Sequence, residues 1–212
     1  MDNKMEKGTE LIYLAQRIRA LSQTALTYSK DEYEIERSHE LIEISHRITS
    51  LVTGIDENEI TSLYIPQKEY ITPKVDIRAV VFNEKDEILL VQEKIDERWA
   101  MPGGWSDVGF SPKEVVVKET KEETGLDVRV DRLLAIMDKR CHPHPPSSFY
   151  VYKLFILCEV TGGTFNETFD ILDKGFFALD NLPPLSLERT LPEQVLLMDQ
   201  LRRNPSAPTY ID

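Results

Sequence analysis

The chain has 212 residues, 41% of them hydrophobic, and its 25 Lys and Arg against 37 Asp and Glu give a formal net charge of −12. This acidic balance argues against stable nucleic-acid binding, because that task requires clustered cations. The chain start has no cationic stretch leading into an apolar run, and no segment reaches the roughly 20 apolar residues of a membrane helix. We therefore expect a cytoplasmic protein without membrane contact, with one sizeable core and a smaller unit.

Residues 1–60 predict a helical N-terminal extension. Apolar residues recur at a three-four spacing in two runs, within residues 11–25 and 41–52, and each run indicates a helix. Between them, the S-x-x-E sequence that starts at Ser29 has the form of a capped helix start, and Gly54 is placed to end the second helix. Two helices with one apolar stripe each are too small to stand alone, so we expect packing on the main domain or a homodimer.

Residues 61–73 contain Pro66 and Pro73 and are expected to form a linker to a main domain at 74–212. From Lys74 the pattern changes to strands, and two apolar runs on either side of the polar turn 83–86 predict a hairpin. Further strands are expected near 126–138, 149–160 and 175–179, with helices near 111–124 and 190–203. This order indicates an α/β or α+β fold with a mixed sheet covered on its faces, followed by a poorly ordered tail.

The helix predicted at 111–124 contains the most informative residues. Ser111 is followed by a proline and by a glutamate three positions on, the pattern of a capped helix start, and Gly125 suits the left-handed position after a helix end. Glu119, Glu122 and Glu123 stand at i, i+3 and i+4, which places three carboxylates on one face.

Like charges at this spacing repel each other, and a divalent cation converts the repulsion into a binding site. Gly103 and Gly104 precede the helix and lack side chains, so a phosphate could approach the backbone there. The alternative is a solvated surface helix with Lys–Glu pairs, which is the usual meaning of such a charge run. The fixed order of double glycine, helix start, acidic triplet and terminal glycine favours the metal site.

The segment 101–128 resembles the Nudix box, G-x5-E-x7-R-E-U-x-E-E-x-G-U with U apolar, aligned from Gly104 to Leu126. The likeness extends over residues 74–180, and the N-terminal helices resemble the extension of a subgroup that includes CDP-choline pyrophosphatases. The resemblance implies a Nudix-type α/β/α sandwich with a mixed sheet.

It also implies a hydrolase that splits the diphosphate bond of a nucleoside diphosphate linked to another group, with CDP-choline or ADP-ribose as first choices. The products would be a nucleoside monophosphate and a phosphorylated remainder. By resemblance, Glu119 and Glu123 would be the principal ligands of Mg²⁺ or Mn²⁺. Glu122 would be a further ligand or the group that takes a proton from the attacking water.

The sequence departs from the box in three places. Phe110 stands where the first glutamate is expected, Lys118 replaces the arginine, and Thr120 fills an apolar position. Lys118 is expected to position a carboxylate of the cluster, with a solvent-facing lysine as the alternative. These departures motivate a second hypothesis, a Nudix-like module that binds or senses a nucleotide without cleaving it.

Several other residues have two interpretations each. Arg78, within the first strand of the main domain, either reaches substrate phosphates or pairs with a surface carboxylate at a sheet edge. His142 and His144 either border the substrate cleft or lie in a solvated loop. Three aspartates could replace the missing box glutamate or serve only in turns: Asp107, Asp170 and Asp173.

Overall fold

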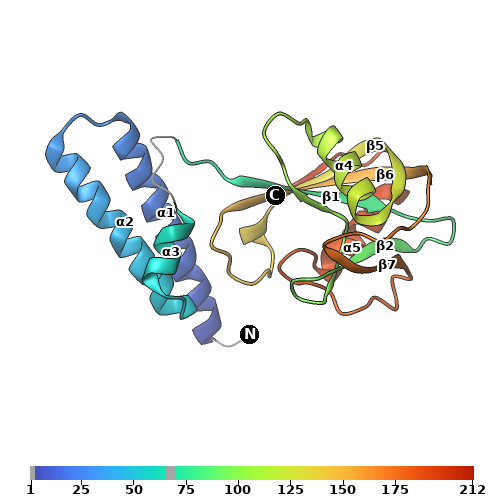
Figure 1. Ribbon diagram of the computed structural model, residues 1–212, viewed down its shortest axis with the longest axis horizontal. Coiled ribbons are helices and arrows are strands. Elements are labelled where there is room, and N and C mark those ends of the chain that lie inside the picture. The colour runs from blue at the N-terminus through green and yellow to red at the C-terminus, as the bar shows by residue number, and fades with distance from the viewer. Residues whose placement is uncertain (1–2, 65–69) are drawn as a thin grey trace. The chain divides into compact units, whose positions relative to one another are not determined.

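The computed structural model describes residues 3–64 and 70–212, and the chain divides into two compact units (Figure 1). The helical unit comprises Met1–Pro73 together with Pro145–Tyr150, and the sheet unit comprises Lys74–His144 and Val151–Asp212. Among the described residues, no helix is both long and apolar enough to cross a membrane.

The described part of the helical unit contains α1 (Asn3–Tyr28), α2 (Glu32–Thr53) and α3 (Glu57–Leu63). The predicted pair of helices is present, and Gly54 ends α2 as expected, in the left-handed conformation with φ 75°. The third helix was not predicted, and it extends into the segment expected to be a linker. Its first turn is held by Asp56, whose side chain accepts a hydrogen bond from the N–H of Asn58 at 2.9 Å.

The predicted start of α2 at Ser29 is wrong. Asp31 caps the helix instead, because its side chain accepts a hydrogen bond from the N–H of Glu34 at 3.0 Å. The Ser29 hydroxyl donates to the carboxylate of Glu34. An aspartate satisfies a free N–H as well as a serine does, and its negative charge is favourable at a helix N-terminus. Asp31 is therefore the better capping residue of the two.

The sheet unit contains eight strands and two α-helices among its described residues. The strands are β1 (Lys74–Val81), β2 (Ile88–Glu93), β3 (Trp99–Ala100), β4 (Gly103–Trp105), β5 (Leu126–Asp138), β6 (Val151–Gly163), β7 (Ile171–Phe177) and β8 (Tyr210–Ile211), and the helices are α4 (Pro112–Thr124) and α5 (Pro192–Arg203), with a 3-10 turn, η1 (Lys139–Cys141). One sheet has the order β4-β1-β6-β5-β8 and a smaller one the order β3-β2-β7. The larger sheet is mixed, since β1 pairs with β6 in parallel and β5 with β6 antiparallel.

Two apolar clusters cover the faces of β1. Ile77, Ala79 and Val81 pack with Val115 and Val116 of α4. The intervening Val80 packs in the cluster that contains Val195 and Met198 of α5. Because successive strand residues face opposite sides, α4 and α5 cover opposite faces of the sheet, as in the expected sandwich.

The predicted hairpin of β1 and β2 is wrong. The chain does turn at residues 83–86, where the side-chain oxygen of Asn83 accepts hydrogen bonds from the N–H groups of Lys85 and Glu87. The two strands share only one bridge, between Phe82 and Ile88, and then belong to different sheets. Strand β1 pairs with β6 along its whole length and with β4 at residues 76–78, whereas β2 pairs with β3 and β7.

The expectation of a poorly ordered tail is also wrong. Residues 210–211 form β8, which pairs in parallel with Ala135 and Ile136 of β5. The side chain of Asp212 accepts a hydrogen bond from the N–H of Asp138 at 2.7 Å, and the Thr209 hydroxyl donates to the carbonyl of Leu133 at 3.2 Å. The partners of the tail are more than 70 residues away in the sequence, so its local composition could not reveal these contacts.

Candidate active site

Helix α4 begins and ends where the sequence predicts. The Ser111 hydroxyl accepts from the N–H of Glu114, and the Glu114 carboxylate accepts from the N–H of Ser111, which completes the capping box. At the other end Gly125 has φ 83° and its N–H donates to the carbonyl of Lys121 at 2.9 Å. Thr120, unusual at an apolar position, is fully buried, and its hydroxyl donates to the carbonyl of Val116 at 2.7 Å. The helix is thus held in one register against the sheet.

This register brings two of the three glutamates to the double glycine. The N–H of Gly103 donates to Oε2 of Glu123 at 2.8 Å. A Cβ atom at Gly104 would lie 3.2 Å from Oε2 of Glu119, and one at Gly103 would lie 2.0 Å from the carbonyl oxygen of Ile77. Close packing on the backbone of β1 therefore requires a glycine at 103, whereas a side chain at 104 would press on the carboxylate of Glu119. The role of both glycines in binding phosphate stays a prediction.

The side chain of Glu122 is 59% exposed. Its partner is Lys118, whose ammonium nitrogen lies 3.4 Å from Glu122, 3.2 Å from Glu119 and 3.5 Å from Asp107. The same nitrogen lies 5.9 Å from the ring centre of Phe110, the residue at the place of the first box glutamate. Lys118 thus lies within 3.5 Å of three carboxylates, and its role in positioning them stays a prediction.

The electrostatic surroundings of Glu123 differ from those of Glu122. The pKa of Glu123 is raised to about 8, chiefly by burial and also by the nearby carboxylates of Glu93 and Glu119, against the opposing effects of Arg78 and the Gly103 N–H. A buried carboxyl group among other carboxylates is a costly arrangement that a cation would relieve.

Glu93, at the end of β2, was not singled out from the sequence. Its carboxylate lies 3.2 Å from the guanidinium of Arg189 and 4.0 Å from that of Arg78. It follows a short apolar run and precedes a lysine, so no local pattern distinguishes it from a surface glutamate. Only the pairing of β2 with its neighbours places it near Glu123.

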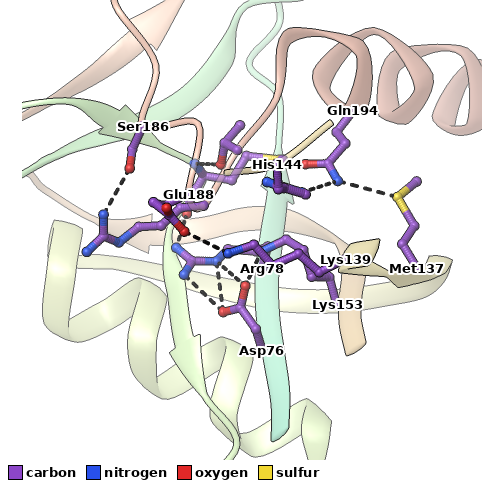
Figure 2. Close-up of polar contacts among 12 residues, drawn as sticks. Asp76, Arg78, Met137, Lys139, His144, Lys153, Ser186, Glu188 and Gln194 are labelled. Atoms are coloured by element: carbon purple, nitrogen blue, oxygen red, sulfur yellow. Dashed lines mark hydrogen bonds and ion pairs between the residues drawn. The ribbon is translucent and has the colours of Figure 1, made fainter. Parts of the chain in front are cut away.

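Arg78 is 5% exposed and lies on β1, between β4 and β6, so the alternative of an edge position with a surface carboxylate is wrong. Its guanidinium pairs with the buried Asp76 at 2.9 Å (Figure 2). It also donates to the carbonyl of Met101 at 3.0 Å. Contact with substrate phosphates stays a prediction, one that this burial does not favour.

His142 pairs with Asp212 at 3.0 Å, and its predicted role in binding substrate stays untested. His144 is buried, with ring nitrogens at hydrogen-bond distance from the Leu187 carbonyl and the Gln194 amide, so a solvated position is wrong for it. Asp170 and Asp173 are exposed. Asp173 lies within β7, opposite Gln92, so the predicted turn position is wrong for it.

The donor chemistry of the site fits a hard divalent cation, because Glu119 and Glu123 offer carboxylate oxygens at one place and Glu93 lies near. Within residues 3–64 and 70–212, however, no three His, Cys, Asp or Glu side chains form a ready-made metal site. Glu122 would become a third carboxylate ligand from α4 only if its side chain moved from Lys118 to the cation.

Comparisons with known proteins agree with this geometry. The NUDIX domain model matches residues 72–198, and a model described as a UDP-X-like N-terminal oligomerisation domain matches residues 9–64. A putative ADP-ribose pyrophosphatase of Bacillus subtilis, YjhB, is 43% identical over 204 residues, which cover 96% of this chain and 98% of the relative.

Two solved structures are also similar. The ADP-ribose pyrophosphatase of Streptococcus suis is 48% identical with a TM-score of 0.61, and the match covers 66% of this chain and 100% of that one. The crystal structure of a UDP-X diphosphatase is 33% identical with a TM-score of 0.63, and it covers 97% of this chain and 99% of its own.

The chain therefore belongs to the Nudix family, and it is a pyrophosphohydrolase that acts on nucleoside diphosphates linked to a further group. Within that family it has the type of N-terminal oligomerisation domain named for UDP-X-like enzymes, ahead of the hydrolase domain. Enzymes of this family generally use divalent metal cations.

Proposed function

We propose that the protein hydrolyses ADP-ribose or a closely related nucleoside diphosphate conjugate, in a reaction that depends on Mg²⁺ or Mn²⁺. The observation that carries this proposal is the meeting of Glu119 and Glu123 at Gly103 and Gly104 of β4. The names of the relatives favour ADP-ribose first and a uridine diphosphate conjugate second. CDP-choline stays a candidate on the sequence resemblance of the N-terminal helices.

The side chains divide the work as follows in this proposal. Glu119 and Glu123 hold the cation, which supplies neutralising charge for the diphosphate when it is bound. Glu122 is exposed and so can reach solvent, where it acts as a further ligand or takes the proton of the attacking water. Lys118 orients Glu119 and Glu122, and the Gly103 N–H fixes one oxygen of Glu123. The products are a nucleoside monophosphate and a phosphorylated remainder.

Turnover of a panel of conjugates tests this assignment. ADP-ribose, CDP-choline and a UDP-sugar are incubated with Mg²⁺ or Mn²⁺ and the products are identified by mass. We expect Glu123→Gln to lower kcat about 100-fold, equivalent to about 2.7 kcal/mol of transition-state stabilisation. The same change at Glu159, an exposed residue paired with Arg129, is the matched control and leaves kcat unaltered.

The other candidate is a module that holds a nucleotide without cleaving it, for which Phe110 and Lys118 are the motivating departures from the box. Tight nucleotide binding without metal-dependent products across the panel would establish it. A Glu123→Gln variant that is folded and fully active would refute the assignment of the site even if the wild-type enzyme cleaves a conjugate.

We further propose that the helical unit joins two copies of the chain as a homodimer. The match to an N-terminal oligomerisation domain supports self-association through residues 9–64. The acidic charge of the chain gives no support to a stable nucleic-acid partner.

A further inference from the structure

Three charged side chains follow one another across one face of the larger sheet. Asp76 and Arg78 are two residues apart in β1 and so face the same side. Lys153 of β6 lies directly opposite Asp76 in the parallel register. All three residues are at most 5% exposed, so this row lies inside the sheet unit.

The carboxylate of Asp76 lies between the two cations and contacts both of them. The Lys153 ammonium donates to Oδ2 of Asp76, and the Arg78 Nε donates to both oxygens of the same carboxylate at 3.0 and 3.2 Å (Figure 2). Burial alone would raise the pKa of Asp76, but the charges of Arg78 and Lys153 hold it well below its usual range. Asp76 is therefore an anion shared by two buried cations.

The far end of Arg78 reaches the candidate active site. Its Nη1 donates to the carbonyl of Met101 at 3.0 Å and lies 4.0 Å from the carboxylate of Glu93. In the strand ladder Arg78 lies opposite Gly103, whose N–H holds Glu123. The orientation of the guanidinium thus affects both the start of β4 at Gly103 and the charge that Glu93 and Glu123 experience.

Packing alone does not explain why a lysine is buried at position 153. An apolar side chain of similar length would fill the same space without burying a charge, and such exchanges are often neutral or favourable for stability. Burial lowers the pKa of Lys153 to about 8, with Asp76 opposing the shift, so the fold bears a cost to keep an ammonium there. Arg78 alone already pairs with both oxygens of Asp76, so a second cation is not needed to neutralise that carboxylate.

We propose that Lys153 is a positioning residue for the hydrolytic reaction: through Asp76 it holds Arg78 in the orientation that the carboxylates of the active site require. Lys153 itself contacts neither those carboxylates nor the substrate in this assignment. The inference rests on the proposed function of the Glu119–Glu123 site.

The test compares Lys153→Met with Lys139→Met. Lys139 is also buried, at 8% exposure, but it pairs with Glu188 at 2.8 Å and not with Asp76 (Figure 2). We expect Lys153→Met to lower kcat about tenfold or more with KM changed less than about threefold, because a misplaced group affects the transition state more than ground-state binding. Lys139→Met should keep kcat within about twofold, and Lys153→Arg, which retains a cation for Asp76, should recover part of the loss.

A second readout does not require turnover. The ¹H–¹⁵N signal of the Gly103 amide, which donates to Glu123, should move in Lys153→Met and stay in place in Lys139→Met. Absence of activity in the wild-type enzyme would refute the proposed function, and the amide shift would still decide the positioning role. The role is overturned if folded Lys153→Met keeps the wild-type kcat or the wild-type amide shift, or if Lys139→Met loses as much as Lys153→Met.

Discussion

His144 lies between two polar partners that allow one protonation state. Its Nδ1 lies 2.6 Å from the Leu187 carbonyl and so donates to it, while Nε2 lies 3.0 Å from the side-chain nitrogen of Gln194 and so accepts from it. Burial lowers the pKa of His144 to about 3, since a proton on Nε2 would face a donor in a dry environment. The imidazole is therefore neutral throughout the neutral pH range.

This neutral histidine predicts a loss of stability in acid. Between the ordinary value of 6.5 and about 3, the unfolded chain binds a proton at His144 that the folded chain does not. The contribution is complete above pH 6.5 and is lost as pH falls through that window, by at most about 1.4 kcal/mol per pH unit. Urea unfolding at pH 7 and pH 5 should show a smaller decrease for His144→Gln than for the wild-type protein.

His39 provides the control for this measurement, because it is exposed on α2. His39→Gln should retain the wild-type dependence on pH. If His144→Gln and the wild-type protein lose the same free energy of unfolding between the two pH values, the buried neutral imidazole is not the cause.

Helices α2 and α4 end in the same backbone conformation in different surroundings. Gly54 has φ 75° and Gly125 has φ 83°. A Cβ atom at Gly54 would meet nothing within 4 Å, whereas one at Gly125 would lie 2.4 Å from the carbonyl oxygen of Thr164 and 2.6 Å from the side-chain oxygen of Asn166. A substitution at Gly54 therefore measures the free-energy cost of a left-handed residue alone, whereas one at Gly125 adds the cost of a steric clash.

Alanine substitutions should therefore differ in effect. We expect Gly54→Ala to cost about 1 kcal/mol of stability, the strain of a left-handed alanine. Gly125→Ala should cost at least about twice as much, because the backbone at Thr164 has to move, and it should also lower kcat by displacing the end of α4 that carries Glu122 and Glu123. Denaturant unfolding of both variants measures the first effect, and equal costs would contradict the role assigned to the clash.

At the scale of the whole molecule, the helical unit leaves large apolar side chains exposed on α1 and α2. Among the residues whose burial the structure describes, eight are between 42% and 78% exposed: Leu11, Leu14, Leu21, Tyr28, Tyr33, Leu41, Ile44 and Leu51. Exposed apolar surface of this kind marks an interface, in agreement with the oligomerisation domain matched at 9–64.

Charged substitutions on α1 should separate the copies. Leu14 and Leu21 are two turns apart and are 52% and 53% exposed, so together they lie on one face of the helix. Leu14→Glu with Leu21→Glu should lower the mass measured by light scattering from that of a dimer to that of one chain. Leu172→Glu, at a leucine of 50% exposure in the sheet unit, should leave the mass unchanged. A wild-type chain that already runs as a monomer would refute the dimer.

The sequence by itself determined the features that depend on near neighbours. The bounds of α4 follow from the capping residues at Ser111 and Gly125, and the shared face of its glutamates follows from their spacing of three and four residues. The same short-range signals carry the resemblance to the Nudix box and so the class of enzyme. They could not predict that Glu123 would be buried and bonded to the Gly103 N–H while Glu122 stays exposed beside Lys118.

The tertiary structure alone decided which distant residues meet. Asp76 and Lys153 are 77 positions apart and are joined by the register of β1 and β6. Glu93 ends β2, a strand of the second sheet, and the position of that sheet brings Glu93 near Glu123. Strand β8 is defined only by its pairing with β5. Strand pairing depends on which sheet edges are already occupied, a property of the assembled fold that no local pattern of residues contains.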